Sequence, residues 1–139
     1  MDDLLLYRSD KLISTTESDH EMMNTLNIAK VIDFRTNGER ENEPNPKLSF
    51  VEDIHLPIGD ESWGIEDRSA FFDQLMSMDS ASSEQFILDL YKSIPLNFPN
   101  QYETFFDELA EGNGEPVVYH CTAGKDRTGI ATALLFTIL

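Results

Sequence analysis

The sequence has little positive charge, a single cysteine and no long apolar run. Its 139 residues carry 26 acidic and 10 basic side chains, a formal net charge of −16. Such a surface repels nucleic acids and anionic lipids, so we expect no nucleic-acid partner. A lone cysteine, Cys121, excludes an intramolecular disulfide bond. No apolar segment reaches the roughly 18 residues of a membrane-spanning helix, so we expect no stable membrane insertion.

The amino-terminal segment also lacks the features of a secretory signal peptide. It reads MDDLLLYRSD, with acidic residues where a signal peptide carries positive charge and with only a short apolar stretch. A single free cysteine fits a reducing compartment. We therefore expect a cytoplasmic protein; secretion would require an amino-terminal signal that has been removed.

The composition is that of one globular domain. Hydrophobic residues make up 40% of the chain, enough for a packed core at this length. Short runs typical of strands occur at 4–7, 28–35, 50–57 and 115–121. Helical apolar spacing occurs at 71–76, 87–94, 102–109 and 128–139. This alternation predicts an α/β fold in which helices pack on the faces of a central sheet.

Two helix starts are predicted from capping boxes, in which two side chains satisfy each other's backbone N–H groups. One pairs Ser18 with Glu21, and the other pairs Ser82 with Gln85.

The most informative segment is His120–Gly129, which reads HCTAGKDRTG. It follows a predicted strand and leads into a helix that is predicted to begin at Arg127. Backbone N–H groups of such a loop can turn inward and bind an anion, helped by the helix terminus. Gly124 permits the tight turn, and the planar fork of Arg127 can hold two phosphate oxygens. The loop is therefore suited to a phosphate dianion.

The same surroundings act on the cysteine at the start of the loop. Inward N–H groups, a helix terminus and a guanidinium favour a thiolate over a thiol. A thiolate at Cys121 could attack phosphorus and form a cysteinyl-phosphate. The hydroxyl of Thr128 could donate a hydrogen bond to the sulfur when it leaves.

Two other interpretations were weighed. A buried free cysteine beside a surface arginine would have no function, but it would not explain the other loop residues. A nucleotide-binding P-loop is excluded, because Tyr119 and Asp126 stand where that motif requires glycine and serine or threonine.

The loop resembles the phosphate loop of the protein tyrosine phosphatase superfamily. It is most similar to the microbial tyrosine and dual-specificity phosphatases with the loop H-C-x-x-G-K-D-R-[TA]-G. Weaker similarities are Leu6–Leu12 and Val31–Thr36, the latter followed by Glu39-Arg-Glu41. The resemblance implies a mostly parallel sheet and chemistry without metal or cofactor. It also implies that Cys121 is the nucleophile and that the substrate is bound by Thr122, Ala123, Gly124, Lys125, Asp126, Arg127 and Thr128.

The general acid stays open between two aspartates. Within the resembling group the aspartate inside the loop, here Asp126, is favoured, whereas other members use an aspartate on a separate loop, here Asp60. Asp126 could instead be only a charge partner of Arg127. His120 is interpreted as a hydrogen-bonded scaffold rather than a proton carrier.

The chain also departs from the family pattern. It lacks the hairpin before the Arg-Ser segment and the helices after the loop helix, so residues 1–139 are expected to be a partial phosphatase domain, truncated at both ends. The apolar side chains Ile130, Leu134, Leu135 and Ile138 would then be exposed and available for self-association.

Three functions remain. The first is a phosphotyrosine or dual-specificity protein phosphatase, the second a phosphoinositide phosphatase, and the third an inactive phosphate-binding module. Their partners would be phosphorylated proteins or phosphoinositides.

Overall fold

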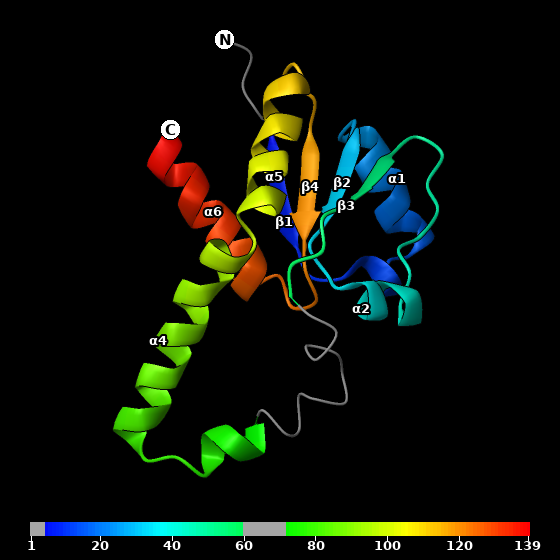
Figure 1. The fold of residues 1–139 in the computed structure, drawn as a ribbon. Coiled ribbons are helices and arrows are strands. Elements are labelled where there is room, and N and C mark those ends of the chain that lie inside the picture. The colour runs from blue at the N-terminus through cyan, green and yellow to red at the C-terminus, as the bar shows by residue number, and fades with distance from the viewer. Residues whose placement is uncertain (1–4, 60–71) are drawn as a thin grey trace.

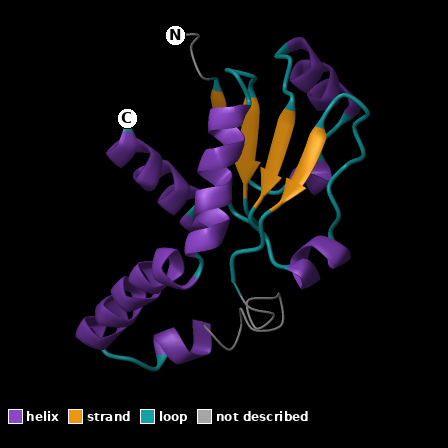
Figure 2. Cartoon of the chain, turned by 45° about the horizontal axis from the view of Figure 1, so that its top comes forward, coloured by secondary structure: helices purple, strands orange, loops and turns teal. Residues whose placement is uncertain are grey.

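The computed structural model describes residues 5–59 and 72–139. Among them, four strands form one sheet in the order β1-β4-β2-β3 (Figure 1). The strands are β1 (Leu6–Ser9), β2 (Lys30–Asp33), β3 (Glu52–His55) and β4 (Val117–His120). Each neighbouring pair is parallel, and the arrowheads that are visible in Figure 2 point the same way. The predicted α/β fold with a mostly parallel sheet is confirmed.

Helices connect the strands and cover both faces of the sheet (Figure 1). They are η1 (Leu12–Ser14), α1 (Glu17–Thr25), α2 (Asn37–Asn42), α4 (Ser80–Asn97), α5 (Pro99–Glu111) and α6 (Asp126–Ile138). Residues 72–76 are also helical. Such crossover connections are what parallel strands require.

Alternate residues of each strand point to opposite faces and build two separate cores. On β4, Val117 and Tyr119 join Phe105 and Leu109 of α5 in the larger core. Val118 points the other way, into a smaller core with Met23 of α1. With both faces covered, every residue of β2 and β4 is buried.

Both predicted capping boxes were wrong in their cap residue. Helix α1 is capped by Thr16, which exchanges hydrogen bonds with Asp19, rather than by Ser18 with Glu21. Helix α4 is capped by Asp79, whose carboxylate accepts from the amide of Ser82. Several polar residues in succession can each cap a helix, so the residue that does so depends on where the helix packs.

The apolar side chains of α6 are less exposed than predicted. Leu135 is buried in the larger core, and Ile130 and Leu134 pack against it. Ile138 is 66% exposed, and Phe136 and Leu139 are exposed beside it. The predicted apolar patch is therefore wrong for three of its four residues, because α4 and α5 cover that side of the helix. In the parts of the chain that the structure describes, no helix is long and apolar enough to cross a bilayer.

The parallel register brings the carboxyl ends of all four strands to one edge of the sheet. His120 pairs with Ser9 on one side and with Asp33 on the other, and Asp33 pairs in turn with His55. Open parallel sheets bind ligands at this edge. The segments that follow the strands therefore converge on the cysteine loop.

Candidate active site

The cysteine loop leaves the end of β4, a strand flanked by β1 and β2. Cys121 is the first residue after the strand and is only 2% exposed. Helix α6 begins at Asp126, so the amino-terminal end of that helix, with its partial positive charge, directly follows the loop. The predicted strand–loop–helix arrangement is present, with the helix starting one residue before Arg127.

The segment after β1 holds the loop from one side. The Lys11 amide donates to the Thr122 carbonyl at 3.1 Å, and Arg8 Nη2 donates to the Gly124 carbonyl at 2.7 Å. Gly124 has a φ of +62°, in the left-handed region. A Cβ there would lie 2.7 Å from the Ser9 carbonyl carbon and 2.9 Å from the Asp10 amide nitrogen. Glycine is thus required both by the turn and by the approach of the neighbouring backbone.

Arg127 turns inward and forms a bidentate ion pair with Glu39 of α2. Its Nη1 donates to Oε2 of Glu39 at 2.7 Å, and its Nη2 donates to Oε1 at 2.9 Å. Nη1 also donates to the Ile58 carbonyl at 3.1 Å. The Thr122 hydroxyl donates to Oε1 of the same glutamate. One buried carboxylate therefore fixes both the guanidinium and the start of the loop.

The electrostatics keep this pair ionised. Burial alone would raise the pKa of Glu39, but hydrogen bonds and charge from Arg127, with the Thr122 hydroxyl, lower it to about 2. Burial likewise opposes the charge of Arg127, yet Glu39 raises the pKa of Arg127 overall. The orientation of the guanidinium is thus maintained across the neutral range.

Sequence reasoning missed this role of Glu39. In the sequence, Glu39 stands out only as part of the weak family similarity Glu39-Arg-Glu41. A local signal was available, because Thr36 and Glu39 form the capping box of α2 and so place the carboxylate at the amino-terminal end of that helix.

His120 is buried beneath the loop in a hydrogen-bonded position. Its Nδ1 lies 3.0 Å from the Cys121 carbonyl oxygen. Since a carbonyl only accepts, Nδ1 carries the proton and Nε2 accepts from the amide of Asn45, 3.4 Å away. Burial lowers the pKa of His120 although Asp33 opposes this, which favours the neutral ring. The geometry fits the scaffold interpretation.

A second buried ion pair supports the network behind the loop. Arg35 holds the Asp33 carboxylate through Nε and Nη2, the latter at 2.8 Å, and both side chains are fully buried. Arg35 Nη1 also donates to the Glu43 carbonyl at 2.8 Å. This pair ties the end of β2 to the segment that follows α2, and so helps to place Glu39.

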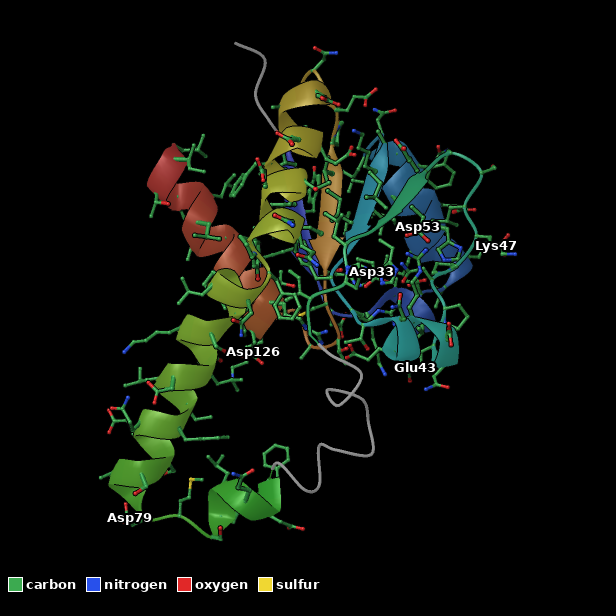
Figure 3. All side chains as sticks on the ribbon, viewed as in Figure 1. Asp33, Glu43, Lys47, Asp53, Asp79 and Asp126 are labelled. Atoms are coloured by element: carbon green, nitrogen blue, oxygen red, sulfur yellow. The ribbon has the colours of Figure 1, made fainter. Side chains whose placement is uncertain are left out.

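Asp126 and Lys125 lie at the outer side of the loop. The Lys125 side chain is 78% exposed, and its Nζ is 3.9 Å from Oδ1 of Asp126, whose side chain is 49% exposed. Figure 3 shows Asp126 where α4 meets α6, and its Oδ1 accepts from the hydroxyl of Tyr91 on α4. The carboxylate that pairs with Arg127 is therefore Glu39, and Asp126 has other partners. Asp60, the alternative acid, lies outside the described residues.

The Thr128 hydroxyl makes no hydrogen bond to the cysteine sulfur in this structure, and the predicted bond to the departing sulfur stays a prediction. Thr128 is fully buried, and its hydroxyl has no hydrogen-bond partner among residues 5–59 and 72–139. Of the remaining loop positions, Thr122 is partly buried and Ala123 is exposed.

No group of three or more acidic, histidine and cysteine side chains within residues 5–59 and 72–139 could hold a metal ion.

The known proteins that are similar to this chain are tyrosine phosphatases. A model of the tyrosine phosphatase family matches residues 2–139. A putative tyrosine-protein phosphatase of Cupriavidus necator is 31% identical over 134 residues, which cover 96% of this chain and 47% of that protein. The triple specificity protein phosphatase PtpB of Mycobacterium tuberculosis is 27% identical, covering 94% of this chain and 54% of the relative. A tyrosine-protein phosphatase of Nostoc commune is also 27% identical, with 42% of the relative covered. The chain thus spans about half the length of these relatives.

Proposed function

The chain belongs to the tyrosine phosphatase family, and on this basis we propose that it is a cysteine-dependent phosphatase that hydrolyses phosphate monoesters. The observation that carries the proposal is the loop after β4. It places a buried cysteine at the amino-terminal side of α6 and holds Arg127 in a bidentate pair with Glu39. We propose that residues 1–139 are a single, partial phosphatase domain.

In the first step, the Cys121 thiolate attacks phosphorus and a sulfur–phosphorus bond forms. The bond between phosphorus and the leaving oxygen breaks, and its electron pair stays on that oxygen. Asp126 transfers a proton to the leaving oxygen and becomes a carboxylate. Loop amides and Arg127 bind the phosphoryl oxygens; a guanidinium has five N–H donors, so Glu39 can orient it while it meets the substrate.

In the second step, water attacks the phosphorus of the cysteinyl-phosphate. Asp126 accepts a proton from the water, inorganic phosphate departs, and the electron pair of the sulfur–phosphorus bond returns to Cys121. We assign Thr128 as the donor to the departing sulfur, because its buried hydroxyl has no competing partner among the described residues. No step requires a metal or cofactor.

A phosphotyrosine or dual-specificity protein phosphatase is the first choice for this site, so its substrates would be phosphorylated proteins. Phosphoinositides are the second, and one observation favours them: the Lys125 side chain is 78% exposed beside the loop, where it could meet a further phosphate of a polyphosphorylated ring. An inactive binding module is the least supported, since Cys121 and Arg127 are both present.

The test is hydrolysis in metal-free buffer of an aryl phosphate, a phosphotyrosine peptide, a phosphoserine peptide and soluble phosphoinositide head groups. We expect the aryl phosphate and at least one of the others to be hydrolysed. Cys121→Ser should abolish turnover but still bind inorganic phosphate, because a serine hydroxyl is not ionised there. Full activity in the serine variant would refute the nucleophile, and phosphate binding without turnover by the wild-type chain would favour the binding module.

A further inference from the structure

The side chain of Tyr91 connects α4 to the cysteine loop. Tyr91 is partly buried, and its hydroxyl donates a hydrogen bond to Oδ1 of Asp126, 35 positions further along the chain. Helices α4 and α6 pack against each other, so the contact is supported by their backbones. Nothing in the sequence motif of the loop identifies a residue of α4 as part of the site.

The contact distinguishes the two oxygens of the Asp126 carboxyl. The Lys125 Nζ is closest to the oxygen that Tyr91 already contacts, at 3.9 Å from Oδ1. Both of these contacts from described residues are therefore made to Oδ1. The hydrogen bond to Asp126 raises the pKa of Tyr91 to about 12, so the phenol stays protonated and remains the donor. Oδ1 is thus occupied as an acceptor, and a transferable proton belongs on Oδ2.

We propose that Tyr91 is a positioning residue that holds the Asp126 carboxyl so that Oδ2 delivers the proton to the leaving oxygen. The inference rests on the proposed phosphatase function. As the Oδ2–H bond breaks and the leaving oxygen gains the proton, negative charge develops on the carboxyl group. A hydrogen bond to an ionised acceptor is stronger than one to a neutral acceptor. Tyr91 therefore stabilises the transition state of proton transfer more than the ground state.

A purely structural role for the same contact makes a different prediction. If Tyr91 only ties α4 to α6, its hydroxyl contributes to folding and has no connection with the leaving group. Removing the hydroxyl would then change all substrates alike, or change stability alone. Dependence of the effect on the leaving group separates the two roles.

The experiment measures kcat/KM, which reports formation of the cysteinyl-phosphate and not its hydrolysis, against the pKa of the leaving group for a series of aryl phosphates. It compares wild type with Tyr91→Phe, Asp126→Asn and the double variant. Tyr91→Phe keeps the ring and removes only the hydroxyl. Ser93→Ala is the matched control, because it removes another hydroxyl of α4, one that donates to the Leu90 carbonyl. Thermal melting of each variant reports any loss of fold.

For Tyr91→Phe we expect kcat/KM to fall about tenfold for poor leaving groups and less than twofold for acidic phenols. The substitution should have no further effect in the Asp126→Asn background, and Ser93→Ala should match wild type. An equal loss for all substrates, or losses that multiply in the double variant, would overturn the inference. An unchanged dependence on the pKa of the leaving group in Asp126→Asn would also overturn it. In that case, if hydrolysis still requires Cys121, the proposed phosphatase function remains intact.

Discussion

Replacing Glu39 by glutamine tests whether its buried ion pair with Arg127 stabilises the fold and orients the guanidinium. The substitution keeps the size of the side chain and removes its charge. The amide retains one oxygen that can accept, but in either orientation its NH₂ group faces an N–H of Arg127, because both oxygens of the present carboxylate accept from that guanidinium. Two hydrogen bonds to Arg127, at 2.7 and 2.9 Å, depend on the present carboxylate. The arginine would remain buried without its counter-charge.

The pKa of Glu39 gives the expected size of the effect. It falls from 4.5 to about 2 on folding, a difference of about 2.5 units, and each unit corresponds to about 1.36 kcal/mol. Because the folded-state pKa is the lower one, this stability is fully present above pH 4.5 and is lost as the pH falls through 2. The ionised form thus contributes about 3 kcal/mol at neutral pH, in line with the roughly 3–5 kcal/mol lost when one partner of a buried pair is removed.

The assay is urea unfolding of wild type and Glu39→Gln at pH 7 and pH 3. At pH 7 the variant should be less stable by about 3 kcal/mol. At pH 3 the carboxyl group is partly protonated in the unfolded and folded states to different extents, and the same linkage predicts that the difference shrinks to roughly half. At neutral pH, kcat/KM for an aryl phosphate should fall at least about tenfold, because the guanidinium loses its fixed orientation.

Glu43→Gln is the matched control. Glu43 follows α2, and its side chain pairs with Lys11 at 2.6 Å in a more accessible position. A pair of this kind contributes about 0–1 kcal/mol. A loss below about 1 kcal/mol in Glu39→Gln, equal to that of the control, would refute the reasoning. A large loss that does not change between pH 7 and pH 3 would contradict the linkage to ionisation.

Two further predictions concern the loop. Arg127→Lys should lower kcat/KM more than tenfold, because an ammonium group cannot form the paired bonds to Glu39 and to phosphate; activity within about threefold of wild type would contradict this. Gly124→Ala should impair both activity and stability, since its Cβ would meet the Ser9 backbone and its φ is +62°. Wild-type phosphate affinity and an unchanged Tm in that variant would show that the loop tolerates a shift of β1.

The chemistry of the loop could be predicted from the sequence because its residues are contiguous. His120–Gly129 specifies a nucleophile, a turn, an anion-binding backbone and a helix start within one short segment. The existence of the strands could also be predicted, because apolar runs report burial. The first and last residues of the strands could not be predicted. The run at 28–35 forms a strand only over Lys30–Asp33, since the residues after Asp33 leave the sheet to build the site.

Tertiary structure alone decided which side chains support the loop. Glu39 is 88 positions from Arg127, and Tyr91 is 35 positions from Asp126, so no local periodicity links either pair. The parallel order β1-β4-β2-β3 brings the segments after β1 and β2 to the loop at the end of β4, and the packing of α4 against α6 brings Tyr91 to it. Sequence proximity had suggested Asp126 as the charge partner of Arg127. The folded chain pairs Arg127 with Glu39 because Arg127 turns into the interior, where a buried cation needs a buried anion, whereas Asp126 stays at the outer side of the loop.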